Sequence, residues 1–219
     1  MRLYTAPLSM FGMKVEIAAH EKGLVPEIVM VPYTAATGYS PMNPDVLRIN
    51  PKGQVPVLVD GDVELYDSTQ IFEYLEDVAP EPPLWPRDIA ARARARQLEH
   101  ASDEVFFPHI IRLMGVQDDL NGEIARTARA GAETYYRLMD ARLEGQTYLA
   151  DAFSFADIAF FMALVFGERL GAPLNDETPK LIAWRDAMVQ RPAVLPVMQR
   201  LVTYLKTNNR YIPEFLSQM

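Results

Sequence analysis

Residues 50–58 of this chain, Asn-Pro-Lys-Gly-Gln-Val-Pro-Val-Leu, could bind an extended ligand through their backbone. Pro56 lies where a β-type run begins, and a proline there removes one donor from the hydrogen-bond ladder. Such a proline is a candidate for a cis peptide bond, which would leave the N–H and C=O of Val55 free to pair with a ligand as an added strand does. The alternative is an edge-strand proline without a role in binding.

A second segment, Asp67-Ser68, precedes a predicted helix and could bind an amino-acid head. Asp and Ser are preferred helix N-cap residues, and capping alone is the usual role of an isolated pair. A helix N-terminus also binds carboxylates through its free N–H groups and its dipole. Ser68 could then hold a carboxylate while Asp67 holds the neighbouring ammonium group.

The two segments flank a predicted hairpin, whose turn is Asp60-Gly61-Asp62. The periodicity predicts strands at 2–5, 27–31, 55–59 and 63–66 and helices at 14–21 and 68–78, with a long loop before the third strand. This order predicts a small mixed sheet with helices packed against it.

Four prolines then follow within residues 79–86, where neither a helix nor a central strand can continue. Strand patterns disappear beyond this point, and helices are predicted at 89–114, 121–144, 154–170, 179–190 and 194–208. We therefore expect an α/β N-terminal domain over residues 1–79, a stiff linker over 80–88 and an all-α C-terminal domain over 89–219.

The composition narrows the classes of function. The 219 residues are 49% hydrophobic and 23% charged, which is typical of a globular protein, and the net charge of -8 argues against nucleic acid as a partner. Without cysteines there is no disulfide or thiolate metal site, and His20, His100 and His109 form no ligand pattern, so we expect no metal. No signal-like or spanning segment is visible, so we expect no membrane association and a cytoplasmic location.

Four motifs in register resemble the glutathione S-transferase family. Residues 50–58, followed after the hairpin by Leu65-Tyr66-Asp67-Ser68-Thr69-Gln70-Ile71, are similar to its glutathione-binding half, and Leu3-Tyr4-Thr5-Ala6-Pro7-Leu8-Ser9 with Lys14-Val15 is similar to its opening. In the helical half, Ser154-Phe155-Ala156-Asp157-Ile158 resembles the family's capping box, in which the Ser and the acid satisfy helix donors reciprocally. The resemblance covers the whole chain and is nearest to bacterial, serine-type members, without assigning a subclass.

This resemblance implies a thioredoxin-like N-terminal domain that binds glutathione and a helical domain that supplies most of the second-substrate pocket. It implies that Val55, before Pro56, pairs with the cysteinyl backbone of glutathione. It also implies that Asp67 and Ser68 hold the γ-glutamyl end, and that Gln54 and Lys52 contact the glycine end. The family is typically homodimeric and acts in detoxification.

The implied reaction needs a glutathione thiolate, because the thiol is a poor nucleophile near neutral pH. Ser9 lies six residues before Val15, the spacing of serine- and cysteine-type relatives, whereas Tyr4 lies nearer to where tyrosine-type relatives place theirs. We favour Ser9, with Tyr4 as the alternative. Ser9 is followed by Met10-Phe11-Gly12-Met13 and not by the usual Pro- and Arg-containing run, and Asp67 replaces the Glu or Gln of many relatives.

Aromatic and apolar side chains at Phe11, Phe106 and Ile110 could line a cleft for the second substrate, together with Phe107 and Met114. The same helical spacing is also typical of a core. We expect a glutathione transferase that acts on a hydrophobic electrophile. The alternatives are a glutathione-dependent isomerase, dehalogenase or peroxidase, or a module that binds glutathione or proteins without catalysis.

Overall fold

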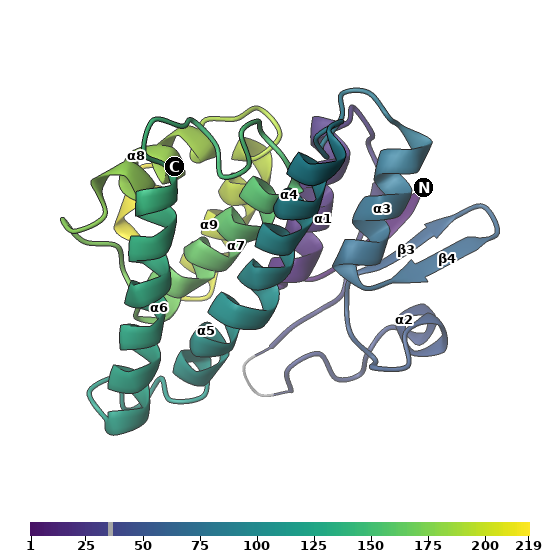
Figure 1. Ribbon diagram of the computed structural model, residues 1–219. Coiled ribbons are helices and arrows are strands. Elements are labelled where there is room, and N and C mark those ends of the chain that lie inside the picture. The colour runs from purple at the N-terminus through teal and green to yellow at the C-terminus, as the bar shows by residue number, and fades with distance from the viewer. Residues whose placement is uncertain (35–36) are drawn as a thin grey trace.

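The N-terminal part of the chain forms a four-stranded mixed sheet, as the computed structural model, which describes residues 1–34 and 37–219, shows (Figure 1). The strand order is β2-β1-β3-β4, with β1 parallel to β2 and antiparallel to β3. The strands are β1 (Arg2–Thr5), β2 (Glu27–Met30), β3 (Val57–Asp60) and β4 (Val63–Tyr66). The fold class expected from the sequence is confirmed.

Three helices accompany the sheet: α1 (Met10–Glu21), α2 (Pro44–Ile49) and α3 (Ser68–Val78). Helix α2 corrects the prediction of a continuous loop before the third strand. Its start carries a recognisable signal, because Asn43 caps the helix by accepting from the Asp45 N–H at 2.9 Å and a proline occupies the first helical position. Ala35 and Ala36 of that predicted loop lie outside the described residues.

The remainder of the chain is helical. Helix α4 (Ile89–Ala101) continues through the π-helical turn Ser102–Phe106 into α5 (Phe107–Met114), and α6 (Glu123–Arg142), α7 (Phe155–Leu170), α8 (Pro179–Val189) and α9 (Leu195–Thr207) follow. Glu214–Leu216 forms a short 3-10 helix. Helix α7 is apolar on all sides because it is the central helix, with α1, α4 and α5 packed around it.

Helix α7 begins at the predicted capping box. The Ser154 hydroxyl accepts from the Ala156 N–H at 3.2 Å, and Asp157 Oδ2 accepts from the Ser154 N–H at 3.0 Å. Asp157 Oδ1 accepts in addition from the Leu149 N–H and the Trp184 indole, at 2.9 and 3.1 Å. The box therefore fixes the start of the central helix to two other segments.

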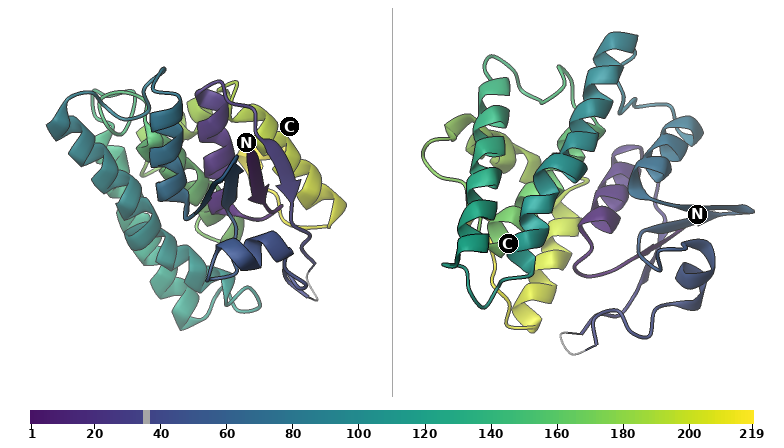
Figure 2. Two further views of the ribbon diagram at one scale, coloured as in Figure 1. Left: turned by 90° about the vertical axis from the view of Figure 1, so that its right-hand side faces the viewer. Right: turned by 60° about the horizontal axis from the view of Figure 1, so that its bottom comes forward.

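The topology gathers several loops at one edge of the sheet. Since β1 and β2 are parallel, the segments that follow them leave the sheet at the same edge. Tyr4 pairs with Val57, which pairs in turn with Tyr66, so β3 begins and β4 ends at that edge too. Both views of Figure 2 show α1 between the sheet and the helical part. This edge is where a ligand would meet both parts of the chain.

Candidate active site

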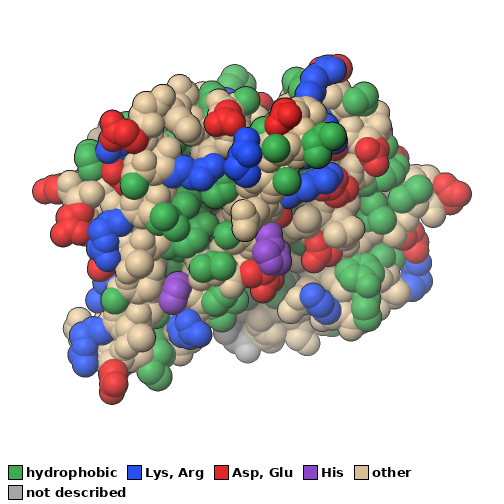
Figure 3. All heavy atoms as spheres, in the orientation of Figure 1, with side chains coloured by type: hydrophobic (Ala, Val, Ile, Leu, Met, Phe, Trp, Pro, Cys, Tyr) green, Lys and Arg blue, Asp and Glu red, His purple; other side chains and the backbone are tan. Residues whose placement is uncertain are grey.

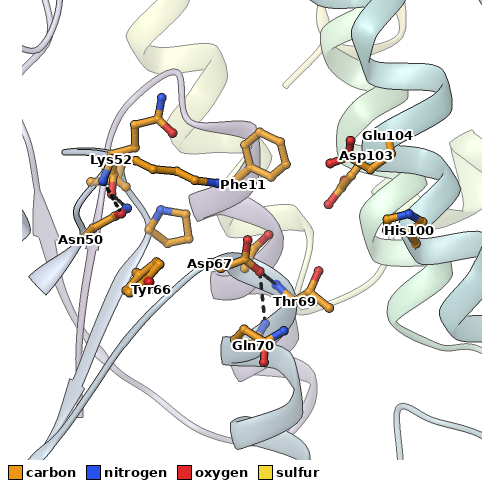
Figure 4. Close-up of a pocket in the computed structure, with 14 residues that line it drawn as sticks. Phe11, Asn50, Lys52, Tyr66, Asp67, Thr69, Gln70, His100, Asp103 and Glu104 are labelled. Atoms are coloured by element: carbon orange, nitrogen blue, oxygen red, sulfur yellow. Dashed lines mark hydrogen bonds between the residues drawn. The ribbon is translucent and has the colours of Figure 1, made fainter.

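A cavity of about 350 Å³ lies at this sheet edge, between the hairpin with the start of α3 on one side and α4 on the other (Figure 4). It is lined by Phe11, Asn50, Lys52, Gln54, Val55, Pro56, Tyr66, Asp67, Ser68, Thr69, Gln70, His100, Asp103 and Glu104. The structure thus brings together every residue that the sequence predicted for glutathione binding.

The Val55–Pro56 peptide bond is cis, as predicted. Val55 is half-buried, and among the described residues its N–H and C=O form no backbone hydrogen bond. The preceding turn is held by Asn50, whose amide donates to the Gln54 carbonyl at 2.6 Å and whose Oδ1 accepts from the Lys52 N–H at 2.9 Å. A fixed turn therefore presents one free backbone donor and one free acceptor beside the cavity, which suits pairing with a peptide.

Asp67 caps α3 and still has capacity for a ligand. Its Oδ1 accepts from the N–H groups of Thr69 and Gln70 at 3.0 and 3.3 Å, whereas its Oδ2 has no hydrogen-bond partner among the described residues. Its φ of 74° lies in a region that non-glycine residues rarely adopt, a conformation that costs about 1–3 kcal/mol and is concentrated at functional sites. Ser68 is buried, and its hydroxyl too has no partner in the described part of the chain.

A buried ionic cluster lies behind the cavity. Lys14 of α1 is fully buried, and its Nζ donates to Glu99 Oε1 at 3.2 Å and to Asp103 Oδ2 at 2.5 Å. Thr69 Oγ1 donates to the same Glu99 oxygen at 2.9 Å. One cation thus serves two carboxylates, and Asp103 Oδ1 is buried without a partner in the described residues. The cluster therefore carries more negative than positive charge, and its Asp103 carboxylate lines the cavity.

Burial raises the pKa of Asp103 to about 6, an effect that the neighbouring Lys14 ammonium opposes. The carboxyl group therefore gains and loses its proton near neutral pH. Figure 4 shows Asp103 with Glu104 and His100 on the α4 side of the cavity, facing Asp67 and Thr69 at the start of α3. Acidic side chains from both walls can surround a ligand ammonium group.

Ser9 is the N-cap of α1. Its Oγ accepts from the Gly12 N–H at 3.0 Å, so its own hydrogen remains available for donation. The backbone N–H groups of Met10 and Phe11 have no partner among the described residues, and they point out of the same helix end. Ser9 is 7% exposed and is not among the residues that line the cavity; Phe11, two residues further, is.

Tyr4, the alternative to Ser9, lies apart from the cavity. It is 3% exposed, packs with Val46 and Val57, and donates its hydroxyl to Asp45 Oδ2 at 2.6 Å. The bond to Asp45 and burial raise the pKa of Tyr4. Its hydroxyl hydrogen is therefore committed to a carboxylate of α2.

Of the side chains predicted for the second-substrate pocket, the structure places only Phe11 at the cavity. Phe11 packs edge to face on Phe107, with ring centroids 5.5 Å apart. Phe106 and Ile110 are 0% exposed and belong to the core of the helical part, where Phe106 packs on Tyr136. Met114 is exposed.

Several cavity residues were missed by the sequence reasoning. His100, Asp103 and Glu104 follow one another at the i, i+3, i+4 spacing of one helix face, and this pattern of polar residues was the available signal. Lys14 offered no such signal, since its burial depends on α4.

In residues 1–34 and 37–219 no group of acids and histidines could hold a metal ion, and no helix has the length and apolarity to cross a membrane.

Comparison with known proteins places this geometry in a family. The model of the glutathione S-transferase N-terminal domain matches residues 3–83, and the model of the C-terminal domain matches residues 105–192. Glutathione S-transferase 3 of Zea mays is 33% identical in an alignment 209 residues long that covers 88% of this chain and 90% of that protein. Several other curated relatives match over less than half of their length. Glutathione S-transferase 1 of Dianthus caryophyllus is 43% identical over 93 residues, 42% of this chain and 41% of its own.

A stringent starvation protein A homolog of Coxiella burnetii is 35% identical over 107 residues, 49% of this chain and 48% of that protein. Among solved structures, a glutathione S-transferase from Rhodospirillum rubrum has a TM-score of 0.77 at 30% identity, covering 90% of this chain and 91% of that chain. A glutathione S-transferase-I bound with lactoylglutathione has a TM-score of 0.76 at 25% identity, covering 91% and 98%.

Proposed function

The chain belongs to the glutathione S-transferase family, and on this premise we propose that it is a glutathione transferase in which Ser9 holds the glutathione sulfur as a thiolate. The thiolate attacks an electrophilic carbon of a small molecule, forming a carbon–sulfur bond. In a substitution, the leaving group departs with the electron pair of the broken bond. A solved relative bound with lactoylglutathione supports glutathione as the ligand of this fold.

The cavity supports each part of glutathione with a different chemistry. The free carboxylate oxygen of Asp67 suits the γ-glutamyl ammonium group. Asp103, whose Oδ1 has no partner in the described residues, suits it too, because Asp103 and Glu99 share the single cation of Lys14 and so leave an excess of negative charge. The start of α3 at Ser68 suits the adjoining carboxylate. Val55 suits the cysteinyl amide, and Lys52 suits the glycine carboxylate.

The observation that carries the proposal is the placement of Ser9 at the N-terminus of α1, at the same sheet edge as the cavity. A hydroxyl donor and the free N–H groups of Met10 and Phe11 both favour a negative charge at this point, and so they would lower the pKa of a bound thiol. Ser9 Oγ accepts from the Gly12 N–H and donates to no described residue, so its hydrogen is available to a bound thiolate.

The test is Ser9→Ala, assayed by glutathione conjugation with an aryl halide. We expect kcat/KM to fall at least tenfold, with a raised pKa of the bound thiol in the pH profile and an unchanged KM for glutathione. Asp88→Ala is the matched control, since Asp88 caps α4 by the same kind of bond, from the Ala91 N–H at 2.8 Å, away from the cavity. Full activity of Ser9→Ala would refute the assignment of Ser9 as the residue that stabilises the thiolate.

The proposal includes a homodimer. An apolar groove between α5 and α6 is bordered by the exposed side chains of Val105 and Leu138, and hydrophobic side chains gather on this face of the helical part in Figure 3. Light scattering should give about twice the 24.8 kDa mass of one chain. A single-chain mass at micromolar concentration would argue against the dimer.

A further inference from the structure

A second cavity, of about 580 Å³, lies in the helical part and shares no lining residue with the cavity at the sheet edge. One wall is a single face of α8, on which Ile182, Arg185, Asp186 and Val189 follow the i, i+3, i+4, i+7 spacing. The other walls are the end of α7 with the loop after it, and the C-terminal segment around Glu214–Leu216. Figure 1 shows α8 far from β3 and β4, so this cavity is remote from the sheet edge.

The cavity is built around a buried ion pair. Arg185 of α8 and Glu168 of α7 are 9% and 8% exposed, and Arg185 Nη1 donates to Glu168 Oε1 at 2.7 Å. The same guanidinium donates from Nε and Nη2 to Asp186 Oδ1, at 2.9 and 2.7 Å. It also lies 4.3 Å from the centre of the Phe215 ring. The guanidinium is therefore committed to carboxylates and to an aromatic ring of the chain itself.

The carboxylates of this cavity outnumber its cations. Glu168, Asp186 and Glu214 line it, and Arg185 is the only basic residue among the described residues that do so. Glu168 Oε2 has no hydrogen-bond partner in residues 1–34 and 37–219, and it is not closed off from solvent. Burial raises the pKa of Glu168, an effect that the Arg185 guanidinium opposes. A further cation at the free oxygen would offset the cost of burying this carboxylate.

The lining favours an organic cation over a metal ion. Among the described residues, no three acids or histidines are placed to hold a metal. Apolar side chains, which include Leu174, Ile182 and Val189, form much of the remaining wall, and Tyr211 and Phe215 add aromatic rings. An ammonium group donates three hydrogen bonds, and aromatic rings attract cations. The apolar side chains suit a hydrocarbon body attached to that group, and the volume is typical of a site for a small molecule.

We propose that this cavity binds a primary amine with an aromatic or aliphatic body. The ammonium group donates to the free oxygen of Glu168, with Glu214 as a second acid of the site, and the body packs on the apolar side chains of α8. The amine is bound and does not react. The inference goes beyond the proposed conjugating function and does not depend on it, because the two cavities have no residue in common.

The test is calorimetric titration of the full chain with 2-phenylethylamine at neutral pH. Two comparison compounds keep the ring and change the charge, since 2-phenylethanol is neutral and phenylacetate is an anion. We expect the amine to bind at millimolar concentration or below, and at least tenfold more tightly than either comparison compound. No binding of the amine, or equal binding of the amine and the alcohol, would overturn the proposal.

Variants assign the binding to this cavity. Glu168→Gln keeps the shape of the side chain and removes its charge, and it should weaken binding of the amine at least tenfold. Glu214→Gln, at an exposed position, should weaken it at least threefold, and it decides the matter if circular dichroism shows that Glu168→Gln does not fold. Glu123→Gln is the control, because Glu123 is exposed at the start of α6 and does not line the cavity. Wild-type affinity in the deciding variant would overturn the proposal.

The sheet-edge cavity also presents acids to an ammonium group, so the titration is repeated in saturating glutathione. Affinity for the amine should stay the same, because the two cavities share no lining residue. Displacement of the amine by glutathione would place it at the sheet edge and overturn the proposal. None of these measurements uses conjugation, so a failure of the proposed function, seen with Ser9→Ala, leaves their outcome unchanged.

Discussion

The protonation of Asp103 makes the candidate site dependent on pH. Its Oδ2 is bonded to Lys14, its Oδ1 is buried without a partner in the described residues, and burial raises its pKa to about 6. Because the pKa in the folded state is higher than in the unfolded chain, the folded protein binds the extra proton. Ionised Asp103 therefore lowers the stability of the protein above about pH 6, and this cost disappears below about pH 4.

Asp103→Asn should remove this dependence. As the pH rises from 4 to 7, the free energy of unfolding of the wild-type protein should fall by roughly 2–3 kcal/mol relative to the variant, the amount that corresponds to such a pKa shift. Urea denaturation at the two pH values measures it. Asp118→Asn, a change at an exposed position, is the control, and parallel pH profiles for wild type and Asp103→Asn would contradict the prediction.

The variant should also change glutathione binding. If the ionised Asp103 carboxylate holds the ligand ammonium group, KM for glutathione in the wild-type protein rises as the pH falls through about 6. In Asp103→Asn we expect a higher KM that is flat over this range.

Helix α1 connects the sheet to the candidate catalytic residue through a close contact at Gly12. A Cβ atom at Gly12 would lie 2.0 Å from Thr5 Oγ1 on β1 and 3.1 Å from Ser9 Oγ. Only glycine allows the first turn of α1 to lie this close to the strand, so the residue type at position 12 sets the position of Ser9.

Gly12→Ala should push the first turn of α1 away from β1. We expect a loss of about 1–3 kcal/mol in the free energy of unfolding, typical of overpacking, and at least a tenfold loss of kcat. Gly115→Ala is the matched control, since its Cβ would meet the nearest atom, the Arg112 carbonyl oxygen, at an ordinary 3.5 Å. Wild-type kcat in Gly12→Ala would show that the position of Ser9 does not depend on this contact.

Ion pairs join the sheet part and the helical part, and most of them include α1; Arg96 of α4 also pairs with Glu73 of α3. Lys14 binds Glu99 and Asp103 of the α4 segment, Glu21 binds Arg191 with Nε to Oε1 at 2.7 Å, and Glu16 binds Arg200. Lys14 is the fully buried member and serves two carboxylates, so the relative position of the two walls of the cavity depends on it.

Lys14→Met should destabilise the protein by about 3–5 kcal/mol, because it leaves two carboxylates buried without their cation. Urea denaturation at pH 7 measures the change, and the loss should shrink toward pH 4 as Asp103 takes up its proton. Arg48→Met serves for comparison, since Arg48 forms an exposed pair with Glu64, and its unfolding midpoint should stay where it is. Equal midpoints for the two variants would contradict the buried cluster's role.

Much of the fold follows from local patterns in the sequence. Alternation and turn residues predicted β1, β4 and α3 with their observed bounds, and the position of Pro56 before a strand predicted its cis peptide bond. The capping box at Ser154 was likewise visible, because its two residues lie three positions apart in the chain. These features depend on interactions between near neighbours, which a sequence displays directly.

The tertiary structure decided which side chains meet. Periodicity identifies Phe106 and Ile110 as one apolar face, but only the packing of α5 against α6 and α7 shows that this face is core and not cleft. In the same way, the sequence predicted the segments around Val55 and Ser68 as one motif, whereas the acids opposite them, Asp103 and Glu104 of the π-helical turn after α4, come from a distant part of the chain. Burial and charge pairing are properties of the folded neighbourhood, so no single stretch of sequence contains them.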